Sequence, residues 1–322
     1  MSQPIRWGVL GAARIAQTAV CPAIHLAEGA VLAALATTNP ARAGAFTAQF
    51  PGLRLHAGYQ ALLDDPAIDA VYIPLPNDLH VPWTTAALAA GKHVLCEKPI
   101  ALQAGEIDGL IAARDATGRL AAEAFMVVHH PQWRRVRALL AEDAIGRLVH
   151  VEGAFAYPPP APGNYRHDPG MGGGALRDIG VYPAVTTRFA TGAEPARVEA
   201  RIDREGGVDR FARVWAEFAE FTLSFYVSMA LAGRQEMVFH GTEGVLRLPG
   251  PFRPDANDGG RIEWQRADGS EVIERFPRVD QYRLMVEAFG AAARGSAPFA
   301  CPLEFSRGNQ AMIDAILAAD PG

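Results

Sequence analysis

The strongest constraint on the fold is an alternation of short apolar strands and helices that fills the chain from residue 6 to residue 124. The strands are apolar at nearly every position, which is typical of strands buried on both faces of a sheet. They are expected at 6–10, 30–37, 70–74, 93–96 and 120–124. The helices between them are expected at 14–27, 40–50, 62–66, 80–90 and 104–117. Because parallel strands need such crossover helices, the pattern predicts a doubly wound parallel α/β sheet.

The pattern changes after about residue 123. Strand-like runs separated by turn signals are expected at 148–155, 198–202, 211–218, 221–227, 236–240, 245–248 and 262–265. Helices are expected at 131–143, 175–190, 282–294 and 303–319. Strands at hairpin spacing predict a second, mostly antiparallel sheet. The segment 157–174 is rich in Pro and Gly and is expected to be irregular.

Composition excludes several classes of protein. A chain of 322 residues is long for one core and suggests two domains. A net charge of −5 without a basic stripe argues against nucleic acid. No apolar stretch reaches the roughly 18 residues of a membrane span, and the N-terminus lacks the apolar core of a secretory signal. Cys21, Cys96 and Cys301 show neither disulfide nor zinc spacing, so we expect no metal and a cytoplasmic location.

A turn of small residues follows the first strand. Gly11, Ala12 and Ala13 form it, and Arg14 and Ile15 open the next helix. Gly11 permits a tight turn, and the alanines let backbone N–H groups approach a pyrophosphate at the helix N-terminus. Alanine replaces the second and third glycines of the dinucleotide-binding fingerprint, so an ordinary strand-to-helix turn is an equal alternative.

The end of the second strand carries hydrogen-bonding side chains and no acid. Thr37, Thr38, Asn39 and Arg42 lie there, and no carboxylate occurs between residues 29 and 63. An NAD-selective site usually has an acidic residue at this point, which binds the ribose 2′-hydroxyl and repels a 2′-phosphate. The segment therefore favours NADP, although NAD stays possible. The alternative is that Thr38 and Asn39 only cap the following helix.

The loop after the third strand is held open by prolines beside the same edge of the sheet. We expect Pro76 and Asn77 to contact the cofactor, with the Asn77 amide bonding a ribose or carboxamide group. His80 is placed in the same set, with orientation of the loop or capping of its helix as the favoured alternative role.

The buried-looking strand at 93–96 runs directly into Glu97, Lys98 and Pro99. Ligands of open α/β sheets bind at the carboxyl ends of the strands. A lysine placed there can polarise a carbonyl or an alcohol, and Pro99 restricts Lys98 to an extended backbone. The alternative is a solvated Glu–Lys pair that only ends the strand.

A run of three glycines, 172–174, leads to Asp178 and Tyr182. A helix places residues i and i+4 on one face. A carboxylate beside a phenol, with a lysine supplied from elsewhere, is a workable acid/base set for interconverting an alcohol and a carbonyl. The alternative is a Tyr182 that packs in a core with its hydroxyl satisfied.

Together these motifs resemble the glucose-fructose oxidoreductase / inositol dehydrogenase / MocA (Gfo/Idh/MocA) family over nearly the whole chain. Its specific parts are Glu97-Lys98-Pro99 and the glycine run with Asp178 and Tyr182. Supporting parts are residues 7–16, 123–126 and 130–133. The resemblance implies a Rossmann dinucleotide-binding domain, residues 1–122. It also implies a substrate-binding and oligomerisation domain, residues 123–322, with a large open sheet.

The resemblance also assigns roles to single residues. Lys98 is implied to be the catalytic lysine, with Glu97 beside it at the cofactor, and Asp178 to be the acid beside the substrate. Tyr182 stands where inositol dehydrogenase-like members have histidine. A tyrosine there resembles the branch of glucose-fructose oxidoreductase, xylose dehydrogenase and dimeric dihydrodiol dehydrogenase. Residues 127–128 are Val-Val, where that branch often has Tyr-Arg, whereas Asn164 and Arg166 match its Asn-x-Arg.

We therefore expect an NADP-preferring oxidoreductase that transfers hydride between nicotinamide and a sugar or similar polyhydroxy compound. Tyr182 would exchange the hydroxyl proton and Lys98 would stabilise the alkoxide. The substrate pocket is expected to be lined by Tyr157, Asn164, Tyr165, Arg166, Asp178 and Tyr182. Two alternatives stay open, a trans-dihydrodiol dehydrogenase and a non-catalytic NADP-binding sensor.

The second sheet is expected to join copies of the chain into a dimer or tetramer. Its strands carry many apolar residues, among them Phe218, Phe221, Phe225, Val227 and Met229. A sheet with helices on one face leaves the other face to be covered by a partner.

Overall fold

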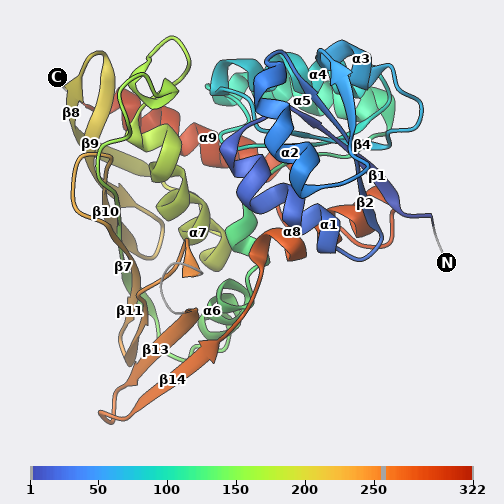
Figure 1. Ribbon diagram of the computed structural model, residues 1–322. Coiled ribbons are helices and arrows are strands. Elements are labelled where there is room, and N and C mark those ends of the chain that lie inside the picture. Colours follow the sequence, from blue (N-terminus) through green and yellow to red (C-terminus); the bar gives the residue numbers. More distant parts are fainter. Residues whose placement is uncertain (1–2, 255–258, 321–322) are drawn as a thin grey trace. The chain divides into compact units, whose positions relative to one another are not determined.

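The computed structural model describes residues 3–254 and 259–320, and these form two compact units (Figure 1). The first unit comprises Met1–His129 and Asp280–Arg307, and the second comprises His130–Val279 and Gly308–Gly322. The division falls inside helix α9 (Leu303–Ala318). The functional division at residue 122 stays a prediction, since it concerns what each part binds.

The first unit contains a sheet of six parallel strands in the order β3-β2-β1-β4-β5-β6. Their bounds are β1 Ile5–Leu10, β2 Ala30–Thr37, β3 Arg54–Ala57, β4 Ala70–Ile73, β5 His93–Cys96 and β6 Ala121–Glu123. The strand order reverses between β1 and β4, and ligands of such sheets bind at the carboxyl ends beside this switch point. The sequence did not reveal β3, an edge strand in which no residue is buried.

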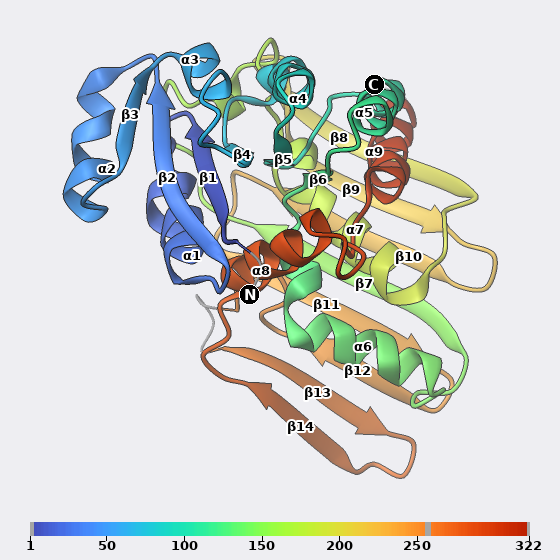
Figure 2. The ribbon, with the colours of Figure 1, turned by 90° about the vertical axis from the view of Figure 1, so that its right-hand side faces the viewer.

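Helices cover both faces of this sheet. Alternate strand residues pack in one core with α3 (Tyr59–Leu63), α4 (His80–Ala89) and α5 (Ala104–Thr117). On the other face α1 (Cys21–Leu26) packs with α8 (Gln281–Ala293), far along the chain (Figure 2). Trp7 of β1, which is fully buried, contacts Phe289 of α8 at 4.9 Å between ring centroids. The predicted parallel α/β architecture is confirmed.

The second unit contains a sheet of eight strands in the order β14-β13-β12-β11-β7-β10-β9-β8. Their bounds are β7 Leu148–Ala156, β8 Arg197–Glu205, β9 Val208–Glu217, β10 Thr222–Ser228, β11 Arg234–Gly241, β12 Gly244–Leu248, β13 Gly260–Arg266 and β14 Glu271–Phe276. Every neighbouring pair is antiparallel except β7 with β10. The prediction of a large, mostly antiparallel sheet is therefore confirmed.

Helices α6 (Pro131–Ala141) and α7 (Val181–Thr191) belong to the second unit, and α7 covers one face of its sheet. A Cβ at Gly153 of β7 would lie 3.4 Å from Pro183 of α7 and 3.1 Å from Phe225. The apolar side chains of β10 therefore point toward the helices rather than away from them.

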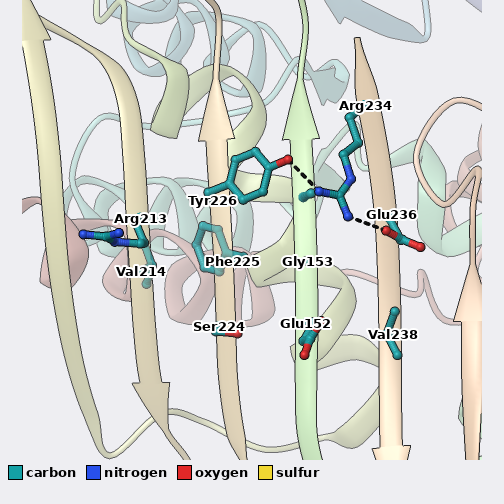
Figure 3. Close-up of a pocket in the computed structure, with 11 residues that line it drawn as sticks. Glu152, Gly153, Arg213, Val214, Ser224, Phe225, Tyr226, Arg234, Glu236 and Val238 are labelled. Atoms are coloured by element: carbon teal, nitrogen blue, oxygen red, sulfur yellow. Dashed lines mark hydrogen bonds and ion pairs between the residues drawn. The ribbon is translucent and has the colours of Figure 1, made fainter. Parts of the chain in front are cut away.

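This arrangement corrects the reason given for oligomerisation. The five apolar residues at 218–229 named above are at most 7% exposed within one chain, so a partner is not needed to cover them. Strand residues alternate between faces, and the opposite face of β10 carries Ser224 and Tyr226. Figure 3 shows this polar face, where Arg234 donates hydrogen bonds to Tyr226 (2.9 Å) and Glu236 (2.6 Å) beside a hollow of about 240 Å³.

Candidate functional site

The turn after β1 has the backbone that a tight turn requires. Gly11 has a φ of +111°, and a Cβ there would lie 2.8 Å from Leu75. Helix begins at Arg14 and takes a π form over Ala16–Val20 before α1. π-Helical turns are rare and occur frequently at functional sites. The small side chains of Ala12 and Ala13 and the glycine backbone thus fit a pyrophosphate at this helix start.

The side chains at the end of β2 differ: some make hydrogen bonds within this segment, and others are exposed to solvent. The Asn39 amide oxygen accepts from the Ala41 N–H at 3.1 Å and caps the 3-10 turn Pro40–Arg42, which precedes α2 (Ala43–Gln49). Thr37 is buried, and its hydroxyl accepts from the Asn39 N–H at 3.0 Å. Thr38 and Arg42 are exposed. Asn39 therefore caps this turn, and the cofactor contacts expected of Thr37, Thr38, Asn39 and Arg42 stay predictions.

The predicted site residues of the loop after β4 differ in their exposure to solvent. Pro76 is partly exposed, Asn77 is 5% exposed in the turn Asn77–Leu79, and His80 is fully buried at the start of α4. His80 Nδ1 lies 2.7 Å from the Pro99 carbonyl oxygen, and Nε2 lies 2.8 Å from the Leu75 carbonyl oxygen. Both ring nitrogens of His80 face backbone carbonyl oxygens, which fits the alternative role of orienting these loops, and its expected part in the cofactor site stays a prediction.

Lys98 lies in a turn that leaves β5 at the carboxyl edge of the sheet. The Glu97 N–H donates to the Ile73 carbonyl of β4 at 3.0 Å, and the Glu97 carboxylate accepts from the Tyr72 hydroxyl at 2.6 Å. Burial, together with the charge of Glu97, raises the pKa of Tyr72 well above its usual value, so this hydroxyl stays a donor. The Lys98–Pro99 peptide bond is cis, and Lys98 is partly exposed.

Sequence reasoning assigned no role to Glu123, the last residue of β6. It is 3% exposed, and its carboxylate accepts from the Ile100 N–H at 2.9 Å. Burial raises the pKa of Glu123 to about 7, against the opposing effects of the Ile100 amide and the charge of Lys98. The sequence signal for Glu123 was its position, because it follows an apolar run and begins the motif 123–126 that supports the family resemblance.

The second unit brings three of the predicted site residues into direct contact. Asp178, 7% exposed in side chain, accepts from the Tyr157 hydroxyl at 2.5 Å and pairs with Arg166 Nε at 2.8 Å. The Arg166 guanidinium lies 4.8 Å from the centre of the Tyr165 ring, and the Asn164 side chain accepts from the Arg166 N–H at 3.1 Å. Two residues of the irregular segment thus contact the Asp178 carboxylate, and two more contact Arg166.

The charge state of this cluster follows from its contacts. Burial opposes the charge of Arg166, but the ion pair with Asp178 is stronger and holds the pKa of Arg166 above its usual value. Burial and the negative charge of Asp178 both raise the pKa of Tyr157. Tyr157 therefore stays protonated and donates to the Asp178 carboxylate, which also pairs with Arg166.

Asp178 and Tyr182 lie on one continuous helical segment that begins with a π turn, Leu176–Gly180, and continues as α7. Tyr182 is 6% exposed, and its ring packs against Phe155 and Phe252, with centroids 5.5 and 5.4 Å away. The predicted helix is present. The flanking aromatic rings were not predicted because they come from other parts of the chain.

The glycine run holds this segment against the irregular one. A Cβ at Gly173 would lie 2.5 Å from the Arg166 carbonyl oxygen, and one at Gly174 would lie 2.0 Å from the Asp209 carboxylate. Asp209 of β9 also accepts from the Leu176 N–H at 2.6 Å, at the start of the π turn. A side chain at position 173 would displace the Arg166 backbone, and one at position 174 would displace the Asp209 carboxylate.

A hollow of about 290 Å³ lies at the surface of the irregular segment, lined by Asn164, Tyr165, His167 and Met171 among others. Across residues 3–254 and 259–320, no group of three or more His, Cys, Asp and Glu is arranged to hold a metal ion. In the same part of the chain no helix is long and apolar enough to cross a membrane.

Comparison with solved structures finds similar folds over nearly the full length of the chain. The 3-ketoreductase KijD10 from Actinomadura kijaniata, in complex with NADP and TDP-benzene, matches with a TM-score of 0.91 and 33% identity, over 99% of this chain and 98% of that one. Structures of KijD10 variants with one lysine or one tyrosine replaced match as well.

Comparison of sequences finds relatives over nearly the full length. An uncharacterised oxidoreductase of Rhizobium meliloti is 39% identical, over 97% of this chain and 96% of the relative. A dTDP-3,4-didehydro-2,6-dideoxy-alpha-D-glucose 3-reductase of Streptomyces antibioticus is 36% identical, over 91% and 90%. A D-xylose 1-dehydrogenase (NADP+) of Haloferax volcanii is 35% identical, over 91% and 90%.

Two family descriptions cover most of the chain. The oxidoreductase family with an NAD-binding Rossmann fold matches residues 5–125, and the GFO/IDH/MocA C-terminal domain matches residues 133–247. The six-stranded sheet and its Gly11 turn fall in the first match, and Asp178 and Tyr182 fall in the second. The chain therefore belongs to the Gfo/Idh/MocA family of nicotinamide-dependent oxidoreductases.

Proposed function

We propose that this protein is an NADP-preferring oxidoreductase that interconverts a hydroxyl and a carbonyl group on a sugar or similar polyhydroxy compound. The observation that carries the proposal is the Asp178 carboxylate, which Tyr157 and Arg166 both contact, four residues before Tyr182. A pocket built from ionised and hydroxyl-bearing side chains suits a substrate with many hydroxyl groups, because buried polar groups without partners are costly.

Each residue has a chemical task in this proposal. The nicotinamide cofactor supplies the hydride acceptor or donor when it is bound. Tyr182 exchanges the proton of the substrate hydroxyl, and the charge of Lys98 stabilises the developing alkoxide. Tyr157 does not exchange this substrate proton, because its hydroxyl already donates a hydrogen bond to Asp178. The lysine and tyrosine variants made in KijD10 replace the same two residue types.

We base the proposed preference for NADP on the residues at the end of β2. Thr38 and Arg42 are exposed there, and no carboxylate occurs between residues 29 and 63 to repel a 2′-phosphate. KijD10 binds NADP, and the xylose dehydrogenase relative is named for NADP. We also place the chain in the tyrosine branch of the family on the strength of Tyr182.

A specific observation favours a second candidate substrate. Several relatives at 33–36% identity are reductases of a dTDP-linked keto sugar. The decisive experiment follows NADPH at 340 nm with a panel that separates the classes: free aldoses, polyols and a trans-dihydrodiol with NADP, and free and dTDP-linked keto sugars with NADPH. Turnover of the dihydrodiol alone would point to the dihydrodiol dehydrogenase, and NADP binding without any turnover would support a sensor.

We also propose that the polar outer face of the eight-stranded sheet joins two copies of the chain. Trp215 of β9 is 42% exposed on this face, stacked on His150 of β7 at 5.4 Å. Aromatic residues such as tryptophan are enriched at interfaces between protein chains. Light scattering at micromolar concentration should give a dimer or larger for the wild type and a monomer for Trp215→Glu; a monomeric wild type would exclude the proposal.

A further inference from the structure

A single peptide group, the one joining Pro99 to Ile100, is bound at both of its polar atoms by buried ionisable side chains. The Pro99 oxygen lies 2.7 Å from Nδ1 of His80, and the Ile100 N–H donates to Glu123 at 2.9 Å. His80 is 0% exposed and Glu123 is 3% exposed. The peptide group begins one residue after Lys98, so it is part of the turn that carries the lysine.

The two side chains reach this peptide from different elements. His80 is the first residue of α4, and Glu123 is the last residue of β6, on the far side of β5 from β4. The second ring nitrogen of His80 lies 2.8 Å from the Leu75 carbonyl in the loop after β4. The turn after β5 is therefore tied to the elements on both sides of it in the sheet.

We propose that His80 and Glu123 are positioning residues for Lys98, which hold the Pro99–Ile100 peptide in one orientation and so fix where the lysine side chain starts. This inference rests on the catalytic role proposed for Lys98. Neither residue touches the substrate or the cofactor directly, since both are buried and bonded to backbone. Displacement of a reacting group by about 1 Å can cost on the order of 10²-fold in rate.

The contact between Glu123 and the Ile100 N–H persists through neutral pH. Burial raises the pKa of Glu123 to about 7, with Glu97 acting in the same direction and Ile100, Ser306 and Lys98 acting against it. A carboxyl group accepts a hydrogen bond in either charge state. Burial lowers the pKa of His80, with the Lys98 charge acting in the same direction and the two carbonyls and Asp78 acting against it. A neutral imidazole has one N–H and donates to only one of the two carbonyl oxygens, and we assign that N–H to Nδ1 and the Pro99 oxygen, which is the shorter contact.

The first test uses two matched replacements of His80. The amide nitrogen of His80→Asn takes the place of Nδ1 and keeps the donor to Pro99, whereas that of His80→Gln takes the place of Nε2 and keeps the contact with Leu75. We expect His80→Asn to retain kcat within about 3-fold and His80→Gln to lose about 10-fold to 100-fold. The Kd for NADPH, measured by fluorescence, should change less than 3-fold in both. Equal kcat values in the two variants would overturn the role of the Pro99 contact.

The second test uses Glu123 in the same way. Glu123→Gln keeps an oxygen for the Ile100 N–H, and Glu123→Leu removes it at similar volume. We expect kcat near the wild-type value for Glu123→Gln and a loss of about 10-fold or more for Glu123→Leu. A normal kcat per cofactor-binding site in Glu123→Leu would overturn the role of this residue.

Lys92→Met is the matched control. Lys92 is 6% exposed and donates to the carbonyls of Asp65 and Ile68 at 2.7 and 2.8 Å, where the chain enters the sheet rather than where it leaves. Replacement of Lys92 should lower thermal stability as the other variants do. It should leave kcat unchanged, because Lys92 precedes β5 whereas Lys98 lies in the turn after that strand. A kcat loss equal to that of Glu123→Leu would show that general destabilisation explains both.

A readout independent of activity separates this inference from the proposed function. Hydrogen exchange of the segment 97–103, followed by mass spectrometry, should speed up about 10-fold or more in His80→Gln and Glu123→Leu and stay unchanged in Lys92→Met. Unchanged exchange in all variants would overturn the inference. If Lys98→Ala itself keeps a normal kcat, the catalytic role of Lys98 fails, while the exchange data still decide whether the turn is held.

Discussion

The Tyr157 hydroxyl donates a hydrogen bond of 2.5 Å to Oδ2 of Asp178, the same oxygen that lies 2.8 Å from Nε of Arg166. One carboxylate oxygen therefore serves both a phenol and a guanidinium. The contact distinguishes the two tyrosines of this region, because burial and Asp178 raise the pKa of Tyr157. Its proton is committed to Asp178, which leaves Tyr182 as the proton carrier of the proposed mechanism.

Tyr182→Phe is the first prediction. The change removes one hydroxyl and leaves the ring packed on Phe155 and Phe252, so the fold should persist. We expect kcat to fall by roughly 10²- to 10⁴-fold, the usual contribution of a positioned acid or base, and one limb of the pH–rate profile to disappear. Tyr157→Phe is the matched control and should keep both limbs. Should Tyr182→Phe keep its rate and profile, the residue only packs.

Lys98→Ala tests the electrostatic role. The charge of Lys98 is proposed to stabilise a developing alkoxide, and removal of such a group costs on the order of 10²-fold or more in kcat. The Kd for NADP should stay within a few-fold of the wild-type value, because the pyrophosphate turn is separate in the chain. Kinetics under saturating substrate and a fluorescence titration measure the two quantities. A near-normal kcat would remove Lys98 from the mechanism.

Arg166→Met tests the ion pair with Asp178. The change leaves a largely buried carboxylate without its counter-charge, so the free energy of unfolding should fall by roughly 2 kcal/mol, the usual cost for a hydrogen bond to a charged group. KM for the substrate should rise at the same time. Arg166→Lys should recover part of the stability but little of the KM effect, since a lysine cannot reproduce the fixed geometry of a guanidinium. Urea titration and initial rates provide the comparison.

Much of the fold could be predicted because buried strands have a strong local signature. The apolar runs at 30–37 and 93–96 coincide with β2 and β5. Edge strands lack that signature: no residue of β3 is buried, and β14 alternates between exposed and half-buried residues. The helix predicted from residue 14 is present but contains a π turn, which depends on packing rather than on propensity.

The candidate site was predictable only where one segment carries its chemistry. The glycine run, Asp178 and Tyr182 are close in sequence, so their spacing and the family resemblance indicated them together. Asp209 and Glu123 come from strands β9 and β6 and reach the site segments through the fold, and a single charged residue within a strand gives no local signal. The catalytic and binding roles of all these residues stay predictions.

Thr38→Asp tests cofactor choice. An aspartate at this exposed position can bind the ribose 2′-hydroxyl of NAD and repels the 2′-phosphate of NADP. We expect the wild type to have the higher kcat/KM with NADP and the variant to shift preference toward NAD by about 10-fold or more, since each 1.4 kcal/mol is tenfold. Thr47→Asp, in α2, is a control outside the turn. An unmodified protein with equal or better kcat/KM for NAD would contradict the reading of residues 37–42.

Asp209→Asn tests how the free energy of unfolding depends on pH. The direction of that dependence follows from the burial of Asp209. Burial raises the pKa of Asp209 from 3.8 to about 6, so the folded chain binds this proton more tightly than the unfolded chain does. The contribution of Asp209 to stability is therefore fully present below about pH 4 and is lost as the pH rises through 6. Asparagine cannot ionise, yet its oxygen can still accept from the Leu176 N–H.

Urea midpoints at several pH values measure this difference. The free energy of unfolding of Asp209→Asn should rise relative to the wild-type value as the pH increases from 4.5, and by pH 7.5 the variant should be the more stable of the two. The change should occur mostly between pH 4 and 6, because that interval separates the unfolded and folded pKa values. A difference between the two proteins that stays constant from pH 4.5 to 7.5 would show that Asp209 is not protonated on folding. In that case its carboxylate holds the Leu176 N–H and the glycine run in the charged state.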